Sequence, residues 1–193
     1  MKTVLKLFFV VIAIMLWIVC ATAQEQPSAP LRPNRTVGSA ELYYFKEKNK
    51  ARAQIRIYLI GKADDVGSSR EALSMDVIFE VDGMKVTQPR YVTIALSSHA
   101  PAKSKYHNDH DLHIHTQGLN ESSGMEWNTR VLSSSNLPSG GSTEIFLTPA
   151  IEYSKFIRMA SAHVVAITFG KTHVILKKED IKALNDLNQT IEK

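Results

Sequence analysis

Residues 74–97 carry the pattern that most restricts the fold of this chain. Their sequence is SMDVIFEVDGMKVTQPRYVTIALS, and every second residue from Met75 to Val81 is apolar. A period of two is the pattern of a strand that buries one face. Asp82-Gly83 follows, and an Asp-Gly pair between two alternating runs favours a type I′ turn, which needs positive φ at both central residues. We therefore predict a β-hairpin at Asp82-Gly83 and a further strand over residues 91–96.

Several other segments share the strand pattern, and two late segments have the pattern of helices. Further strands are predicted over residues 42–45, 51–60, 111–116, 126–132, 143–148, 163–169 and 172–177, with a hairpin turn at Gly170-Lys171. A short helix is predicted near residues 150–160 and a C-terminal helix over residues 179–189. The expected fold is mainly β, an antiparallel β-sandwich or open barrel of about eight or nine short strands. The residues predicted to be buried together are Ile55, Ile57, Phe79, Val81, Ile167 and Leu176.

The first 23 residues have the pattern of a signal peptide. Lys2 and Lys6 precede an uncharged apolar run, and Ala21-Thr22-Ala23 offers the small residues that a signal peptidase requires. Cleavage would make Gln24 the first mature residue. The alternative is an uncleaved anchor, because the apolar run of 17 residues, from 7 to 23, is at the lower limit for spanning a bilayer. Residues 24–39 contain three prolines and predict a flexible linker, so residues 40–193 form the single β-rich domain.

Cysteine content and charge narrow the class of protein. Cys20 is the only cysteine and lies in the predicted signal peptide, so the mature chain has no disulfide and no thiol nucleophile. Its stability therefore depends on the hydrophobic core. Without Lys2 and Lys6, 21 of the 23 basic residues remain against 19 acidic residues, a net charge of +2. Such a balance argues neither for nucleic acid nor for an acidic surface partner, and we expect no nucleic-acid partner.

The densest group of metal-ligand side chains lies in residues 107–115. On a strand, Asp111, His113 and His115 would project from one face, and two imidazoles spaced in this way can share a zinc ion or another first-row divalent metal. His107 and His110 are candidates to complete the ligand set. The alternative interpretation is a solvated polar loop whose histidines bind nothing.

Other candidate features are weaker. Arg52, Arg56 and Tyr58 share one strand face, which would suit an anionic or polysaccharide partner, although a solvated sheet face has the same pattern. No serine lies in a Gly-x-Ser-x-Gly motif. Gly170-Lys171-Thr172 lies between two predicted strands and lacks the upstream glycine of a phosphate-binding loop.

These observations favour an exported, non-catalytic β-domain that is periplasmic or secreted. We expect it to act in binding or interaction at the cell envelope, on a macromolecular partner that the sequence does not specify. Contact with the membrane is expected only if the N-terminal segment stays uncleaved. The alternative hypothesis is a metal-binding protein that uses residues 107–115.

Overall fold

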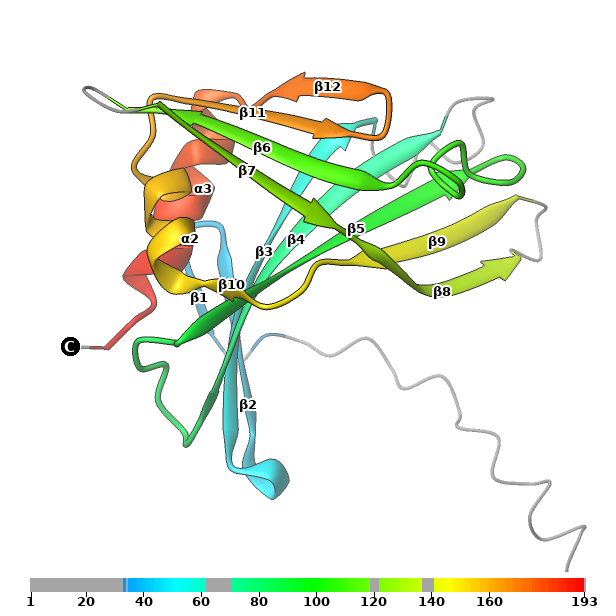
Figure 1. Cartoon of the computed structure of the whole chain (residues 1–193). Helices are drawn as coiled ribbons and strands as arrows, with labels where there is room; N and C mark the ends of the chain where they lie inside the picture. The colour runs from blue at the N-terminus through cyan, green and yellow to red at the C-terminus, as the bar shows by residue number, and fades with distance from the viewer. Residues whose placement is uncertain (1–32, 34, 62–70, 119–121, 137–140, 193) are drawn as a thin grey trace, which may run out of the picture. The chain divides into compact units, whose positions relative to one another are not determined.

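The structure is a computed structural model that describes residues 33, 35–61, 71–118, 122–136 and 141–192. Two antiparallel sheets and two α-helices make up this part of the chain (Figure 1). The larger sheet contains β1 (Arg35–Val37), β2 (Ala40–Phe45), β3 (Lys50–Ile60), β4 (Ala72–Asp82), β5 (Tyr91–Ala100), β8 (Arg130–Asn136), β9 (Ser142–Leu147) and β10 (Ile151–Glu152). The smaller sheet contains β6 (Asp111–Gln117), β7 (Ser122–Asn128), β11 (Val164–Phe169) and β12 (Thr172–Ile175). The predicted signal peptide lies outside the described residues.

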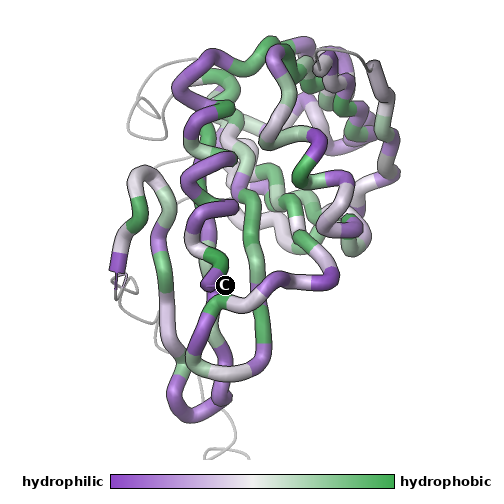
Figure 2. Tube along the Cα trace, turned by 90° about the vertical axis from the view of Figure 1, so that its left-hand side faces the viewer, coloured by the Kyte–Doolittle hydropathy of each residue, from purple (hydrophilic) through white to green (hydrophobic). Residues whose placement is uncertain are grey.

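The larger sheet is centred on the long antiparallel pair of β3 and β4. Its strand order is β1-β2-β3-β4-β5-β9-β8, with β10 paired to β5. Ile55 and Ile57 on β3 pair with Val77 and Met75 on β4, and all four side chains are buried. Hydrophobic and hydrophilic residues alternate along these strands (Figure 2). The period of two in the sequence therefore separates an inner face from an outer face.

The smaller sheet packs on the inner face of the larger sheet, and its strand order is β12-β11-β6-β7. The contact is aromatic: the ring of Phe146 on β9 meets that of Phe169 on β11, with centroids 5.1 Å apart in an edge-on arrangement. Tyr106, from the loop between β5 and β6, lies 4.8 Å from Phe169. Aromatic pairs of this kind stabilise the core by roughly 0.5–1.5 kcal/mol beyond their burial.

The helices cover another part of the larger sheet, beside the smaller one (Figure 1). α2 (Tyr153–Ala160) places Phe156 against Phe79 of β4, with ring centroids 4.9 Å apart. α3 (Lys178–Gln189) buries Leu184 and Leu187 completely. Asp186 of α3 also accepts a hydrogen bond of 3.0 Å from the backbone N–H of Ser39, which ties the turn between β1 and β2 to this helix.

The predicted fold class is confirmed: the protein is mainly β and its sheets do not close into a barrel. Twelve strands are described, more than the eight or nine expected. β1 and β10 are too short to give a pattern, and the single strand predicted over residues 126–132 is divided between β7 and β8. Both helices are present, and the second hairpin turns at Gly170-Lys171 as predicted. Five of the six predicted core residues are buried, and Val81 is partly buried against the same core.

The structure differs from the prediction at the first turn and at the linker. β4 ends at Asp82, but no strand follows directly; β5 pairs with β4 after a loop over residues 83–90. The N–H of Gly83 donates to the carbonyl of Asn49, and the carbonyl of Val86 accepts from the N–H of Glu192. These long-range bonds replace the expected local ladder. Residues 35–37, placed in the predicted linker, pair with β2 as strand β1.

Candidate functional site

The predicted metal-ligand residues of β6 lie on the outer face of the smaller sheet. Asp111, His113 and His115 are exposed, whereas Leu112 and Ile114 between them are buried. The alternation predicted for this segment is therefore present. His113 Nδ1 lies 3.2 Å from the carboxylate of Glu126 on β7, and His115 Nε2 lies 2.9 Å from the Ser122 hydroxyl.

His107 and His110 lie elsewhere, in the loop between β5 and β6. His107 Nδ1 donates to the carboxylate of Glu144 at 2.9 Å. The ring of His110 stacks on Phe146 with centroids 5.5 Å apart, and its Nδ1 is buried without a hydrogen-bond partner among the described residues. The five residues grouped in the sequence are thus divided between the outer face of the smaller sheet and the half-buried positions of His107 and His110 in the β5–β6 loop. Within the described residues, no three His, Cys, Asp or Glu side chains gather in a group that could hold a metal ion.

The arginines of β3 are paired with acids of β4. Arg52 lies 2.8 Å from Glu80, and Arg56 makes two hydrogen bonds, of 2.7 and 2.9 Å, with Asp76. The hydrogen bonds from Lys50 and Arg52 lower the pKa of Glu80 below its usual value. Because these cross-strand pairs neutralise the arginines, this face carries little free positive charge for an anionic partner.

A buried carboxylate lies inside the sandwich near one end of β9. Glu144 is only 1% exposed, because its position on β9 shares the inner face with Phe146. His107 Nδ1 donates to its Oε1, and the Ser134 hydroxyl lies 3.5 Å from the same atom. Oε2 has no hydrogen-bond partner among the described residues. A buried carboxylate oxygen without a donor is costly, so Glu144 is an unusual residue for the interior of a sheet.

A second polar group adjoins Glu144. Ser98 of β5 is the cross-strand neighbour of Glu144, and its hydroxyl donates to Glu71 Oε1 at 2.5 Å. The buried Ser104 hydroxyl donates to the same oxygen at 2.6 Å. These hydrogen bonds satisfy Glu71 Oε1 from within the protein, in contrast to Glu144 Oε2. The end of the sandwich is therefore polar inside, although the rest of its interior is apolar.

Glu144 and His107 line a pocket that opens between the β5–β6 loop and the β8–β9 pair. Its volume is about 500 Å³. The lining residues are Ala102, Lys103, His107, Ser134, Asn136, Gly141, Ser142 and Glu144. Gly141 has a φ of +97°, and a Cβ there would lie 2.4 Å from the carbonyl oxygen of Ala100, so the wall of the pocket requires glycine at this position.

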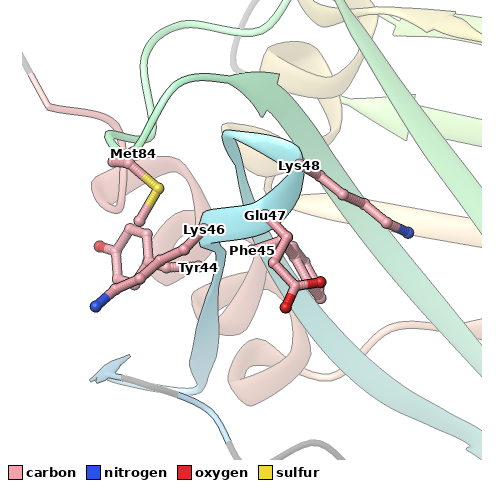
Figure 3. A pocket seen from close by; sticks show the side chains of 6 residues that line it. All are labelled: Tyr44, Phe45, Lys46, Glu47, Lys48 and Met84. Atoms are coloured by element: carbon pink, nitrogen blue, oxygen red, sulfur yellow. The ribbon is translucent and has the colours of Figure 1, made fainter.

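A second pocket, of about 630 Å³, lies at the turn between β2 and β3 (Figure 3). It is lined by Tyr44, Phe45, Lys46, Glu47, Lys48 and Met84. Tyr44 and Phe45 end β2, and the next three lining residues form the 3-10 helix η1 (Lys46–Lys48), which contains no buried residue. We therefore take the smaller pocket as the candidate site, since it alone of these two is lined by a buried charged group.

The His107–Glu144 pair has a defined chemistry. A carboxylate that accepts from Nδ1 fixes the imidazole in the tautomer whose Nε2 carries a lone pair. The side chain of His107 is 35% exposed. Nε2 of His107 can thus accept a hydrogen bond from a ligand, or it can bind a proton. Among the described residues, no hydroxyl makes a hydrogen bond with Nε2 of His107.

His107 was among the candidate residues predicted from the sequence, as a metal ligand, whereas Glu144 was not. Thr143–Thr148 was predicted as a strand, yet apolar residues occupy both of its faces: Phe146 on one, Ile145 and Leu147 on the other. The sequence therefore did not indicate which face of this strand is buried. The available signal was that Glu144 shares its parity with Phe146, the only aromatic residue of that strand.

No helix among the described residues is long and apolar enough to cross a membrane. Comparisons with protein-family models, with curated proteins and with solved structures found no match to this chain.

Proposed function

We propose that this chain is an exported, non-catalytic binding domain that acts at the cell envelope, and that the Glu144 pocket binds a group of its partner. The observation that carries the proposal is Glu144, a buried carboxylate at the wall of a pocket with one oxygen unpartnered among the described residues. Burying a carboxylate is unfavourable unless hydrogen bonds compensate it. A binding function explains why the compensation is incomplete in the free protein.

The pocket has a size that suits this role. Ligand sites typically have volumes of about 300–1,000 Å³, and this one is about 500 Å³. Its walls come from β8, β9 and the β5–β6 loop, so two strands of the larger sheet hold two sides of it in place. A pre-formed site loses less free energy on binding than one that must be ordered by its ligand.

The proposal is tested with a matched pair of variants on β8. Ser134→Trp would fill the pocket, because Ser134 lines it and pairs with Glu144. Ser135→Trp is the control: Ser135 is also exposed, follows directly in the strand and is not among the described residues that line the pocket. A library of polar small molecules is screened by thermal shift against the mature wild type and both variants.

We expect compounds that raise the melting temperature of the wild type and of Ser135→Trp, and that lose this effect in Ser134→Trp. The proposal fails if no compound stabilises the wild type. It also fails if the stabilising compounds act equally on both variants, because their binding would then be independent of the pocket.

Metal binding on the outer face of β6 is the second candidate function. It is favoured by the shared orientation of His113 and His115 on that face, although no third His, Cys, Asp or Glu among the described residues joins them in a metal-binding group. A zinc titration of thermal unfolding at pH 7.5 and pH 5.5 tests it, with a His113→Ala/His115→Ala variant. Metal binding predicts a stabilisation at pH 7.5 that is lost at pH 5.5, as protons compete for the imidazoles, and is absent in the variant. If zinc leaves the melting temperature unchanged at both pH values, metal binding at this face is excluded.

A further inference from the structure

The free edge of β8 indicates the kind of partner that reaches the Glu144 pocket, an inference that rests on the proposed function. β8 is the last strand of the larger sheet, and among the described residues no strand pairs with its outer edge (Figure 1). All seven of its residues are exposed. An uncovered edge presents backbone N–H and C=O groups to which a further strand can bond.

The hydrogen-bond ladder between β5 and β9 determines the direction of the backbone groups of β9. The N–H of Thr148, just after β9, donates to the carbonyl of Ile94 on β5 at 3.0 Å. Hydrogen-bonded and non-hydrogen-bonded pairs alternate along an antiparallel ladder. Every second residue back from Thr148 therefore bonds to β5, and the residues between them direct their N–H and C=O groups toward β8. These residues are Leu147, Ile145 and Thr143.

The same alternation continues into β8. The β9 residues that face β8 have partners there: Ile145 pairs with Ser133, and Thr143 pairs with Ser135. The backbone groups of these two serines therefore bond to β9. Ser134 and Asn136 alternate with them along the strand, so their N–H and C=O groups point to the free edge.

The second half of β8 lacks the features that usually protect a sheet edge. Charged side chains, prolines, bulges and short strands are such features. In β8 the only charge is that of Arg130, and the bulge lies between Val131 and Ser133. Residues 133–136 contain neither a charge nor a proline. At the opposite edge of the same sheet, β1 has only three residues. Strand addition to the larger sheet is therefore most favourable along residues 133–136.

The outward backbone groups belong to residues that also line the Glu144 pocket. Ser134 and Asn136 both line it, and their partners on β9, Glu144 and Ser142, are buried. The side chains of directly opposite residues lie on one face of an antiparallel pair. An antiparallel strand that bonded to Ser134 and Asn136 would thus place the side chains opposite them on the inner face, beside the pocket.

We infer that the partner presents an extended polypeptide segment, which adds an antiparallel strand to β8 and directs a side chain into the pocket. The outward groups of Ser134 and Asn136 are two residues apart, which is the repeat of a strand. Main-chain hydrogen bonds then supply affinity, and the pocket for alternate side chains supplies specificity. A second copy of this chain would meet the domain along the edge alone, whereas a flexible segment follows both the edge and the pocket.

The inference is tested with peptides as probes. A phage-displayed library of random dodecapeptides is selected on the mature wild type, and the enriched peptides are synthesised for fluorescence anisotropy with Ser134→Pro and Ser134→Ala. Both variants lack the hydroxyl, but only proline removes the N–H. Because this N–H points away from β9, the β8–β9 ladder keeps its hydrogen bonds, and proline is tolerated at such edge positions. Thermal unfolding checks that both variants are folded.

We expect the peptides to bind Ser134→Pro about tenfold more weakly than Ser134→Ala, because an acceptor of the peptide would be buried without its donor. A second measurement replaces each backbone N–H of the tightest peptide in turn by N-methyl. Binding to the wild type should weaken at every second residue and persist at the residues between them, since only alternate N–H groups of an added strand face β8. If Ser134→Pro does not fold, this scan alone decides the inference.

Several results would overturn strand addition by a partner segment. These are a library that yields no binding peptide, equal affinities for Ser134→Pro and Ser134→Ala, and an N-methyl scan without a period of two. A wild type that sediments as a dimer, and that Ser134→Pro converts to a monomer, would show that a second copy occupies the edge. The proposed function is decided separately, by the compounds of the thermal-shift screen and their loss in Ser134→Trp.

Discussion

A glycine in the turn between β1 and β2 makes the sharpest prediction about stability. Gly38 has a φ of +56°, and a Cβ built there would lie 2.2 Å from Asp186 Oδ2 and 2.4 Å from its Cγ. Gly61, at the end of β3, has nearly the same φ of +55°, but its Cβ would meet Ala72 at an ordinary distance of 3.7 Å. Alanine at either site adopts the same unfavourable left-handed backbone. The two substitutions therefore differ in the contact with Asp186.

The expected loss of stability follows from the hydrogen bond that Asp186 would lose. Left-handed backbone costs an alanine about 1–2 kcal/mol, and we expect Gly61→Ala to lose about this much stability. In Gly38→Ala the new methyl also displaces a carboxylate that is 5% exposed and accepts the Ser39 N–H. Breaking a hydrogen bond to a charged group costs about 1.5–3 kcal/mol. Gly38→Ala should therefore destabilise the fold by about 2 kcal/mol more than Gly61→Ala.

Urea unfolding of the two variants, and of Gly38→Ala in an Asp186→Ala background, measures this difference. Without the carboxylate the methyl has room, so the extra cost of Gly38→Ala should largely disappear, and the double-mutant cycle should show a coupling of about 2 kcal/mol. Equal losses for Gly38→Ala and Gly61→Ala would refute the reasoning. An unchanged cost of Gly38→Ala in the Asp186→Ala background would refute it as well.

Three further predictions concern pH, the core and export. The hydrogen bond from the Ser39 N–H, together with Lys182, lowers the pKa of Asp186, so its stabilising effect is complete above the unfolded-state value of about 3.9 and is lost as the pH falls through the lower folded-state pKa. Asp186→Asn should accordingly be less stable than the wild type at pH 7, by a margin that shrinks below about pH 4; a constant margin in urea unfolding would contradict this. Phe79 is fully buried against Phe156, so Phe79→Ala should cost about 3–5 kcal/mol, and a loss under about 1 kcal/mol would show that the β4 side chains are wrongly placed. The exported protein should begin at Gln24, as mass spectrometry would show. A chain that retains Met1 in the membrane fraction would indicate an uncleaved anchor.

The strands and helices could be predicted from the sequence wherever a local pattern determines them. The alternation of β3 and β4 reports burial directly, because one face of each strand meets the core. The Gly170-Lys171 turn connects its strands with the pairing of Phe169 to Thr172, so local geometry suffices. Asp82-Gly83 looked similar, but Gly83 bonds to Asn49 and Val86 to Glu192, contacts that join distant parts of the chain. Local turn chemistry cannot anticipate them.

For the same reason, only one of the two paired residues of the candidate site could be predicted from the sequence. His107 attracted interest because of the neighbouring histidines, yet its partner in the structure is Glu144, 37 residues later in the chain. His113 and His115 were correctly placed on one strand face, which is a property of the strand alone. The pairing of His107 with Glu144 depends on the packing of the β5–β6 loop against β9, and no periodicity in either segment encodes it.

The most direct test of the pocket is nuclear magnetic resonance mapping of a bound compound. Backbone amide resonances of the mature protein are followed while the most strongly stabilising compound of the thermal-shift screen is titrated. Binding in the pocket predicts shifts at Ser134, Ser142 and Glu144, with His113 and His115 on the outer face of β6 unchanged. Shifts confined to β6, or no shift at a saturating concentration of the compound, would contradict binding in the pocket.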